Sequence, residues 1–229
     1  MKIVLIFFLI LLLYSNIHSR EIGETEITTE EGIEVFQSEK FYLLKKNVEI
    51  VSDNFLLKGN LIKIHFNESL YDITTIEADE NVELNSIEYK IDSKGDKLLF
   101  NVVNQEIQVE GMSSELNLED VKMISDGFIY VNNNTGEFRI EGPKSELINK
   151  DFQIKAVSIN GIYSETNGQK EIVLLNIFDN ELSFFKSNDI QMYAEKIDFD
   201  NKKSLIELNK NVKIIRGGEV ITGDYGTLD

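Results

Sequence analysis

One short pattern occurs twice in the sequence, at positions far apart. In Asn47–Ile50 and again in Asn211–Ile214, an Asn-Val pair is followed by a charged residue and then an apolar one. Each copy continues with a polar turn and a second apolar run. A Gly stands twelve residues after each Asn, at Gly59 and at Gly223.

The pattern has a direct physical interpretation. Val48 and Ile50 would lie on one face of a strand with Glu49 on the other, and the turn would return the chain as a hairpin. A looser copy begins at Asn81-Val82-Glu83-Leu84, with Gly95-Asp96 arriving two residues later. Such a unit cannot bury its apolar face alone, whereas stacked units form a continuous core.

The rest of the chain favours the same class of fold. Apolar residues alternate with polar ones, and no sustained helical period follows the first residues. Short turn signals separate the alternating runs, which predicts an all-β fold of the sandwich, barrel or roll type. The predicted strands include Val48–Val51, Ile62–Phe66, Ile87–Ile91, Phe128–Val131, Phe138–Gly142, Ile197–Asp200 and Val212–Ile215, and the predicted turns include Ser52–Asn54, Ser93–Asp96, Asn132–Gly136, Asn167-Gly168, Asp200–Lys203 and Gly217-Gly218.

The first residues predict export. One cation, Lys2, precedes an apolar run from Ile3 to Tyr14 and then small and polar residues, which is the plan of a signal peptide cleaved after Ser19. Retention of this segment as an anchor is the alternative. We expect residues 1–19 to be the signal peptide, 20–32 an acidic lead-in that is mobile or orders on contact, and 33–229 one domain.

Composition excludes several classes of function. The chain has no Cys, so disulfides, thiol catalysis and thiolate metal sites are excluded. Its formal charge of −17 opposes binding to nucleic acid. The hydrophobic content of 42% opposes wholesale disorder.

The repeated units resemble those of the OstA-like family, which includes LptA and the periplasmic domain of LptC. The second half of the family phrase matches Ile221, Gly223, Asp224, Tyr225, Leu228 and Asp229, and a half-copy runs over Ala194–Asp200. The resemblance covers about 33–100 and 190–229 and is weak over 101–189. It implies a partly open, V-shaped β-jellyroll built from repeated antiparallel hairpin-like units.

The resemblance also implies a function. Family members bind lipopolysaccharide in an apolar groove, carry it between the inner and outer membranes, and stack head to tail with related partners by edge-strand pairing. We therefore expect a periplasmic, non-enzymatic transport protein with no cofactor and no nucleic-acid partner. The alternatives are an LptC-like anchored component, an extracellular β-solenoid of structural or adhesive role, and a secreted β-jellyroll hydrolase.

Two groups of candidate residues follow from this hypothesis. The lipid-binding groove is predicted to be lined by apolar residues of the repeated units, and the docking edges are predicted to be the first and last strands of the domain. The groove candidates are Val48, Ile50, Phe55, Leu57, Val82, Leu84, Val212 and Ile214, and the edge candidates are Ile33, Glu34, Val35, Phe36, Glu219, Val220, Ile221, Thr222 and Tyr225.

No catalytic or metal site is predicted. His65 shares the polar face of its predicted strand with Lys63, which favours solvent exposure over catalysis. The carboxylates alternate with apolar residues, as expected of a wet strand face rather than of calcium ligands. Phe41-Tyr42 and Phe184-Phe185 are either core residues or lipid contacts.

Overall fold

A computed structural model gives the fold of the chain and describes residues 22–166 and 169–229. The predicted signal peptide lies outside the described residues, as does the predicted turn at Asn167-Gly168. The described chain contains strands and turns throughout, in one antiparallel sheet of 16 strands. The predicted all-β class is therefore confirmed.

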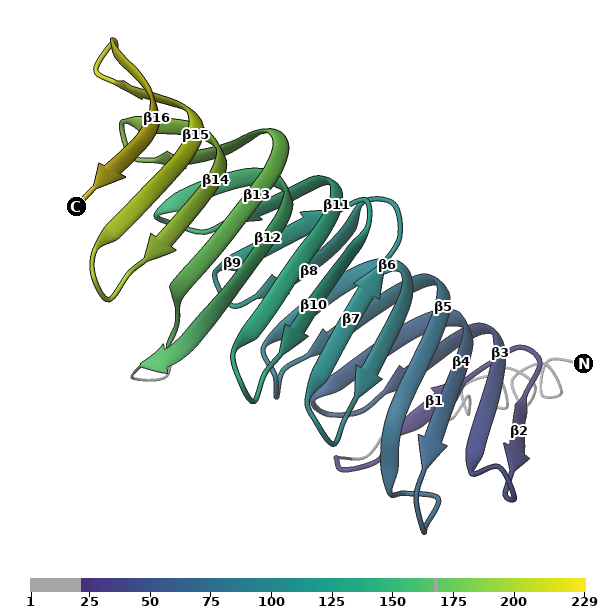
Figure 1. Ribbon diagram of the computed structural model, residues 1–229. Coiled ribbons are helices and arrows are strands. Elements are labelled where there is room, and N and C mark those ends of the chain that lie inside the picture. Colours follow the sequence, from purple (N-terminus) through teal and green to yellow (C-terminus); the bar gives the residue numbers. More distant parts are fainter. Residues whose placement is uncertain (1–21, 167–168) are drawn as a thin grey trace, which may run out of the picture.

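The strands follow one another along the sheet in chain order, apart from short strands near the N-terminus and in the middle (Figure 1). The strands are β1 (Glu26–Thr28), β2 (Ile33–Phe36), β3 (Phe41–Val51), β4 (Phe55–Phe66), β5 (Ile73–Ser86), β6 (Ile91–Asn101), β7 (Glu106–Glu110), β8 (Ser114–Leu118), β9 (Val121–Ser125), β10 (Phe128–Asn132), β11 (Glu137–Ile148), β12 (Phe152–Thr166), β13 (Gln169–Ser187), β14 (Ile190–Asp200), β15 (Leu205–Arg216) and β16 (Glu219–Leu228).

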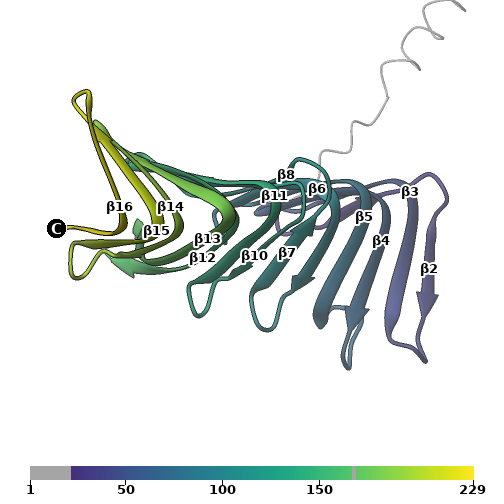
Figure 2. The same cartoon turned by 45° about the horizontal axis from the view of Figure 1, so that its top comes forward.

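The sheet is folded along one line, which we call the corner. Each long strand crosses the corner near its middle, so the sheet has two halves that face each other. The front half-sheet contains β2, β7, β10 and the parts of the long strands level with them, and the back half-sheet contains β1, β8, β9 and the remaining parts. Figure 2 shows the two halves diverging as a V at β15 and β16.

Small residues occupy the inner side of the corner on six hairpins. Directly opposed pairs there involve only Val, Gly, Ser and Ala, because the facing half-sheets leave little room where they meet. We call these residues the corner row: Val48–Gly59, Val82–Gly95, Ser114–Ser125, Ser145–Ala156, Ser183–Ala194 and Val212–Gly223.

The repeated sequence pattern is the device that turns the corner. Between the pairs Lys45–Leu61 and Val48–Gly59, β3 has two residues where β4 has only Asn60, which is a β-bulge. The two residues on the longer side of the bulge, Lys46 and Asn47, have φ of 66° and 49°. Asn tolerates this left-handed conformation better than most residues, so its place before the buried Val has a backbone cause.

The same device recurs in the other two copies. Glu80 and Asn81 face Asp96 alone, and Lys210 and Asn211 face Asp224 alone, again with positive φ on the two-residue side. The Gly of each copy pairs with the Val. Gly95 comes two residues late because its hairpin has four turn residues, Ile87–Lys90, where the Gly217-Gly218 turn has two.

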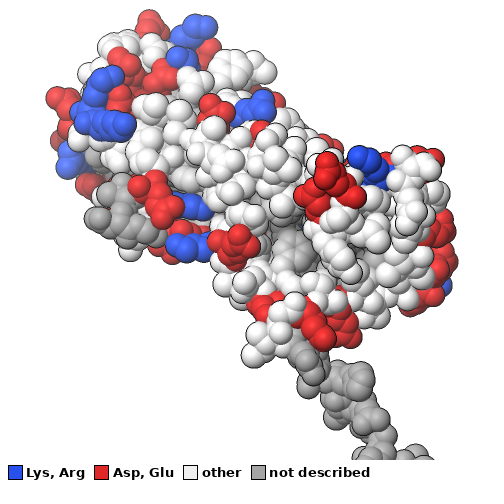
Figure 3. All heavy atoms as spheres, turned by 90° about the horizontal axis from the view of Figure 1, so that it is seen from below, with Lys and Arg blue, Asp and Glu red and all other residues white. Residues whose placement is uncertain are grey.

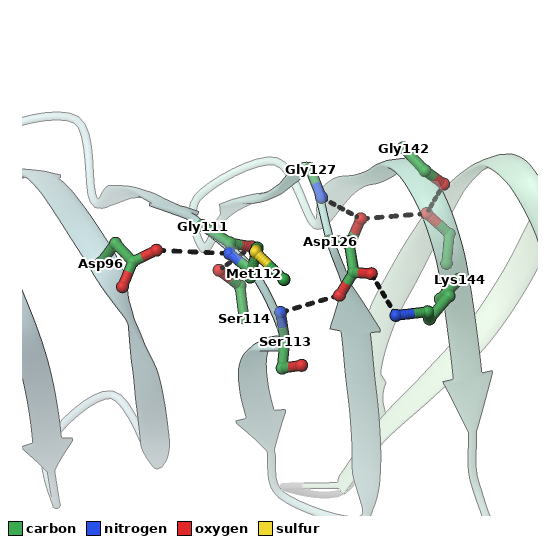
Figure 4. A network of polar contacts seen from close by, with 11 residues as sticks. Asp96, Gly111, Met112, Ser113, Ser114, Asp126, Gly127, Gly142 and Lys144 are labelled. Atoms are coloured by element: carbon green, nitrogen blue, oxygen red, sulfur yellow. Dashed lines mark hydrogen bonds and ion pairs between the residues drawn. The ribbon is translucent and has the colours of Figure 1, made fainter.

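The middle of the chain turns the corner with other residues. Ser125 Oγ donates to the Glu141 carbonyl and lies 3.1 Å from Ser145 Oγ, inside the fold. Outside it, Asp126 accepts hydrogen bonds from the Ser113 amide at 2.8 Å and from Lys144 Nζ at 2.6 Å (Figure 4). The Lys144 hydrogen bond and then the Ser113 amide lower the pKa of Asp126. Here the polar bonds accompany a different irregularity, because three residues of β11 (142–144) face Val157 alone on β12.

Two predicted elements are wrong. Ile87–Ile91 was predicted as a strand, but residues 87–90 form a turn in which Ile87 is exposed and Lys90 has φ of 53°. Ser93–Asp96 was predicted as a turn, but it lies within β6, because Gly95 serves the corner and not a chain reversal. Part of the predicted acidic lead-in, residues 26–28, forms β1 and pairs with β3.

Candidate functional site

The predicted groove residues all lie on the inner face of the folded sheet. Six of them belong to the packed core and are 5% exposed or less, whereas two at its margin are partly buried. The six are Val48, Ile50, Leu57, Val82, Leu84 and Val212, and the two are Phe55 and Ile214. Strand alternation identified the face, and the role in lipid binding remains a prediction.

The interior is apolar from one end of the sheet to the other, and its two ends are less covered than its centre. At the N-terminal end, Ile33 pairs with Leu44 and Val35 with Tyr42, and both Ile33 and Val35 are 48% exposed. At the C-terminal end, Ile221 pairs with Ile214 and is 62% exposed. The core therefore ends in uncovered apolar side chains at both ends.

The predicted docking edges are the outermost strands. Ile33–Phe36 is β2, which pairs only with β3 among the described residues. Glu219, Val220, Ile221, Thr222 and Tyr225 lie on β16, which pairs only with β15 within the same described ranges. The two strands stand at opposite ends of the molecule (Figure 1). Each leaves one line of backbone groups open to a further strand.

The open side of the V, which we call the mouth, lies between the turns of the front half-sheet and those of the back half-sheet. A cavity of about 360 Å³ opens there beside β12–β15. Its apolar wall contains Phe152, Phe185 and Phe199, whose ring centroids are 5.3, 5.7 and 6.1 Å apart, and Ile172 and Ile206 complete it. The rim is charged and contains the turn residues Asp120, Lys150 and Asp151 together with Lys170 of β13.

A polar contact bridges the mouth beside this cavity. The amide of Lys170, on β13 of the front half-sheet, donates to Glu119 on the β8–β9 turn of the back half-sheet at 3.3 Å. Lys170 Nζ donates to Asn133 at 2.8 Å, and the Tyr163 hydroxyl donates to the same oxygen at 2.9 Å. Burial lowers the pKa of Lys170 and raises that of Tyr163. The bridge ties the β12–β13 hairpin across the mouth.

Sequence reasoning found this region only in part. Of Phe184-Phe185, Phe185 is in the interior cluster, whereas Phe184 lies on the outer face and contacts Tyr193 at 5.3 Å between centroids. Phe152 and Phe199 were not singled out. Each stands in an alternating run, Phe152-Gln153-Ile154 and Ile197-Asp198-Phe199, and that alternation is the signal that places them inside.

Charges are distributed unevenly between the two ends of the molecule. Seen from below, Lys and Arg side chains are interspersed with Asp and Glu at the C-terminal end, whereas acidic side chains predominate at the N-terminal end (Figure 3).

His65 and the acidic side chains are the candidates for a catalytic or metal site. His65 Nε2 lies 2.8 Å from Glu77 Oε1 on the outer face. No group of three or more His, Cys, Asp or Glu side chains in the described ranges is placed to hold a metal ion. Within the same ranges, no helix is long and apolar enough to cross a membrane.

Comparisons with known proteins give one structural likeness. No protein-family model matches the chain, and no curated protein matches its sequence. A solved structure that resembles it is LptH of Pseudomonas aeruginosa, the LptA-homologous periplasmic component of the lipopolysaccharide transport device. The sequences are 8% identical, the match covers 48% of this chain and 76% of LptH, and the TM-score is 0.40. At this TM-score we infer nothing from the likeness.

Proposed function

We propose that the protein is a periplasmic carrier that binds lipopolysaccharide by its acyl chains and passes it between the inner and outer membranes. The acyl chains lie between the two half-sheets and the sugars stay in water. The protein acts by binding and not by catalysis. The resemblance of the repeated units to the OstA-like family motivates the choice of lipid.

One observation carries this proposal. A single apolar interior runs the length of the sheet, ends in exposed Ile33, Val35 and Ile221, and opens sideways at the cavity lined by Phe152 and Phe199. Each buried methylene contributes about 0.8 kcal/mol, so an acyl chain there is held without directed bonds. A purely structural roll has no need of an apolar wall open to water.

The partners follow from the edges. Pairing of β16 of one molecule with β2 of the next, or of a related protein, joins the interiors end to end and satisfies both open backbone lines. Because the two edges differ, this contact is heterologous and gives a filament rather than a closed dimer. An LptC-like anchored component of the same machine is the variant of this proposal in which residues 1–19 are retained.

A second function is favoured by a different observation. Five predicted groove residues, on β3, β4 and β5, are packed in a core that is closed between β3 and β6. A closed core is expected of an extracellular β-solenoid with a structural or adhesive role and no lipid.

Photo-crosslinking separates the two functions. A photoreactive residue is placed in turn at Ile214 and Phe199, which are partly exposed inside, and at Leu84, which is closed. The control is Lys213, which neighbours Ile214 but points outward. With added lipopolysaccharide, the carrier gives crosslinks at Ile214 and Phe199 and none at Lys213. If the protein is folded and gives no crosslink at any inner position, the result favours the structural solenoid.

A further inference from the structure

The outer surface of the front half-sheet is hollowed over β11–β15, away from the interior and the mouth. The hollow measures about 670 Å³ and is the size of a small-ligand site. The side chains of the ladder described below point away from the core, to which Ile159 and Ile177 of the same strands belong. Nothing in the proposed transport function uses this surface.

A row of polar side chains crosses the hollow at right angles to the strands. Its members are direct cross-strand partners on five successive strands, so they stand about 4.8 Å apart. From β11 to β15 the row reads Arg139, Asn160, Asn176, Asp198 and Glu207, and we call it the polar ladder. It offers donors at one end, both donors and acceptors in the middle, and acceptors at the other end.

An apolar row lies beside the polar ladder. Ile162 and Leu174 are direct partners on β12 and β13, and Leu205 lies two strands further on. All three line the hollow, and Leu174 is 40% exposed. The hollow therefore presents a line of hydrogen-bonding groups next to two adjoining aliphatic side chains, Ile162 and Leu174, which Asp200 of β14 separates from Leu205.

The polar ladder is held in place and retains bonding capacity. The Arg139 guanidinium carbon lies 4.7 Å from the centroid of the Tyr130 ring, which fixes the plane of the guanidinium. Arg139 makes no hydrogen bond or ion pair with the described residues. Asn176 donates to Asp198, which also pairs with Lys196 at 2.7 Å, and the carbonyl oxygens of both Asn side chains remain open.

Charge limits the class of ligand. Two of the carboxylates in the hollow are already paired, Asp198 with Lys196 and Asp200 with Lys203 at 2.7 Å. Glu137 and Glu207 have no cationic partner of this kind, although Glu207 accepts a hydrogen bond from the Tyr225 hydroxyl at 3.0 Å. Their charges outweigh that of Arg139, so an anionic ligand is repelled rather than attracted. An extended peptide gains no backbone bonds here, because β11–β15 are paired on both sides.

We propose that this hollow binds a neutral oligosaccharide, with its hydroxyls along the polar ladder and the C–H faces of its rings on Ile162 and Leu174. A sugar hydroxyl is both donor and acceptor, and so it matches a row that runs from donors through amides to carboxylates. The planar side chains stand on rigid strands, so little entropy is lost on binding. This site goes beyond the carrier function and does not depend on it.

The test is titration of the purified protein with neutral hexasaccharides of glucose and of N-acetylglucosamine in several linkages, followed by calorimetry. We expect one of them to bind. Asn160→Ala and Asn176→Ala should each raise its dissociation constant by about tenfold. The matched control is Gln108→Ala, which changes the same outer row on β7 but outside the hollow, and it leaves the affinity unchanged.

Three outcomes overturn the proposal. They are binding of none of the sugars, binding that Asn160→Ala and Asn176→Ala leave intact, and tighter binding of a sulfated oligosaccharide than of the neutral ones. Crosslinking of lipopolysaccharide from Ile214 is measured in the same variants. It reports on the carrier function separately, because the polar ladder lies outside the interior.

Discussion

The corner and the mouth of the roll are built in opposite ways. At the corner, small residues oppose one another in six direct pairs, and every residue of these pairs other than Gly has a buried side chain. At the mouth, three Phe rings and charged turns surround a cavity of about 360 Å³. The corner holds the angle between the half-sheets, while the mouth is the part of the interior that a ligand can reach. Substitutions at the corner should therefore change mainly the stability of the fold, and substitutions at the mouth should change mainly ligand binding.

The largest effect is expected from added volume at the corner. In Gly95→Val, the new Cβ would lie 2.6 Å from Val109 Cγ1 and 2.9 Å from the Glu110 carbonyl oxygen, and this backbone oxygen cannot yield cheaply. We expect the free energy of unfolding to fall by about 3 kcal/mol in urea denaturation. The control is Gly223→Ala, where the nearest atom is 3.5 Å away. Equal losses in both variants would mean that the corner is not tightly packed.

The next effect is a lost side chain in the same row. Val82→Ala removes two buried methyl groups, and we expect a loss of about 2 kcal/mol in the free energy of unfolding. Ser125→Ala removes the partner of the Glu141 carbonyl and of the Gly127 amide, and we expect a loss of about 2 kcal/mol for a different reason. If Ser125→Ala is neutral in urea denaturation, the polar corner of the middle strands contributes no stability.

A smaller effect tests the backbone of the bulge. Asn81 has φ of 56°, a conformation that β-branched residues avoid. We expect Asn81→Val to lose about 1–2 kcal/mol in thermal and urea unfolding, and Asn81→Gly to change stability by about 0.5 kcal/mol or less. Matching results for the two variants would show that the Asn side chain, and not its backbone, matters.

At the mouth we expect binding to change more than stability. Ile214→Asn puts a polar group on the partly exposed inner face next to Ile221. The free energy of unfolding should fall by about 1 kcal/mol or less, because the side chain is only partly buried. Crosslinking of lipopolysaccharide from Phe199 should fall severalfold. If Ile214→Asn lost as much stability as Gly95→Val, the mouth would contribute to stability as the corner does, and the contrast between the two would be wrong.

The smallest effect is a change in the pH dependence of stability. Burial holds the pKa of Lys170 below 10.5, against the attraction of Glu119 and Glu165. Between the lowered pKa and 10.5 the unfolded chain binds more protons than the folded one, so this residue makes stability rise with pH in that interval. Lys170→Met removes that contribution. Urea midpoints of the two proteins should converge toward pH 10.5 and diverge below it. A constant difference would contradict the burial of the ammonium group.

The sequence predicted the parts of the fold that local patterning controls. Alternation in Val48-Glu49-Ile50 and in Val212-Lys213-Ile214 gave the inner face correctly. Ile87–Ile91 also alternates, but residues 87–90 form a turn, because the hairpin reverses there and periodicity carries no information on where a strand ends. Gly95-Asp96 has the composition of a turn and bends a strand instead.

What the sequence could not supply depends on contacts between distant strands. The corner row joins Ser114, Ser145 and Ser183, whose spacing shows no repeat because the intervening turns differ in length. The polar ladder is likewise spread from Arg139 to Glu207 and becomes a row only through pairing register. The cavity at the mouth also requires the fold in three dimensions, since Phe152 and Phe199 come from opposite half-sheets.

The bulge of two residues against one allows the length of the roll to change in fixed steps. Because β3, β5 and β15 cross the corner by the same local device, a whole hairpin can be inserted or removed without changing the angle between the halves. Each hairpin adds two strands, or about 10 Å of length. The distance that one molecule spans is thus counted in hairpins, and homologous chains of different length would differ in integral steps of this unit.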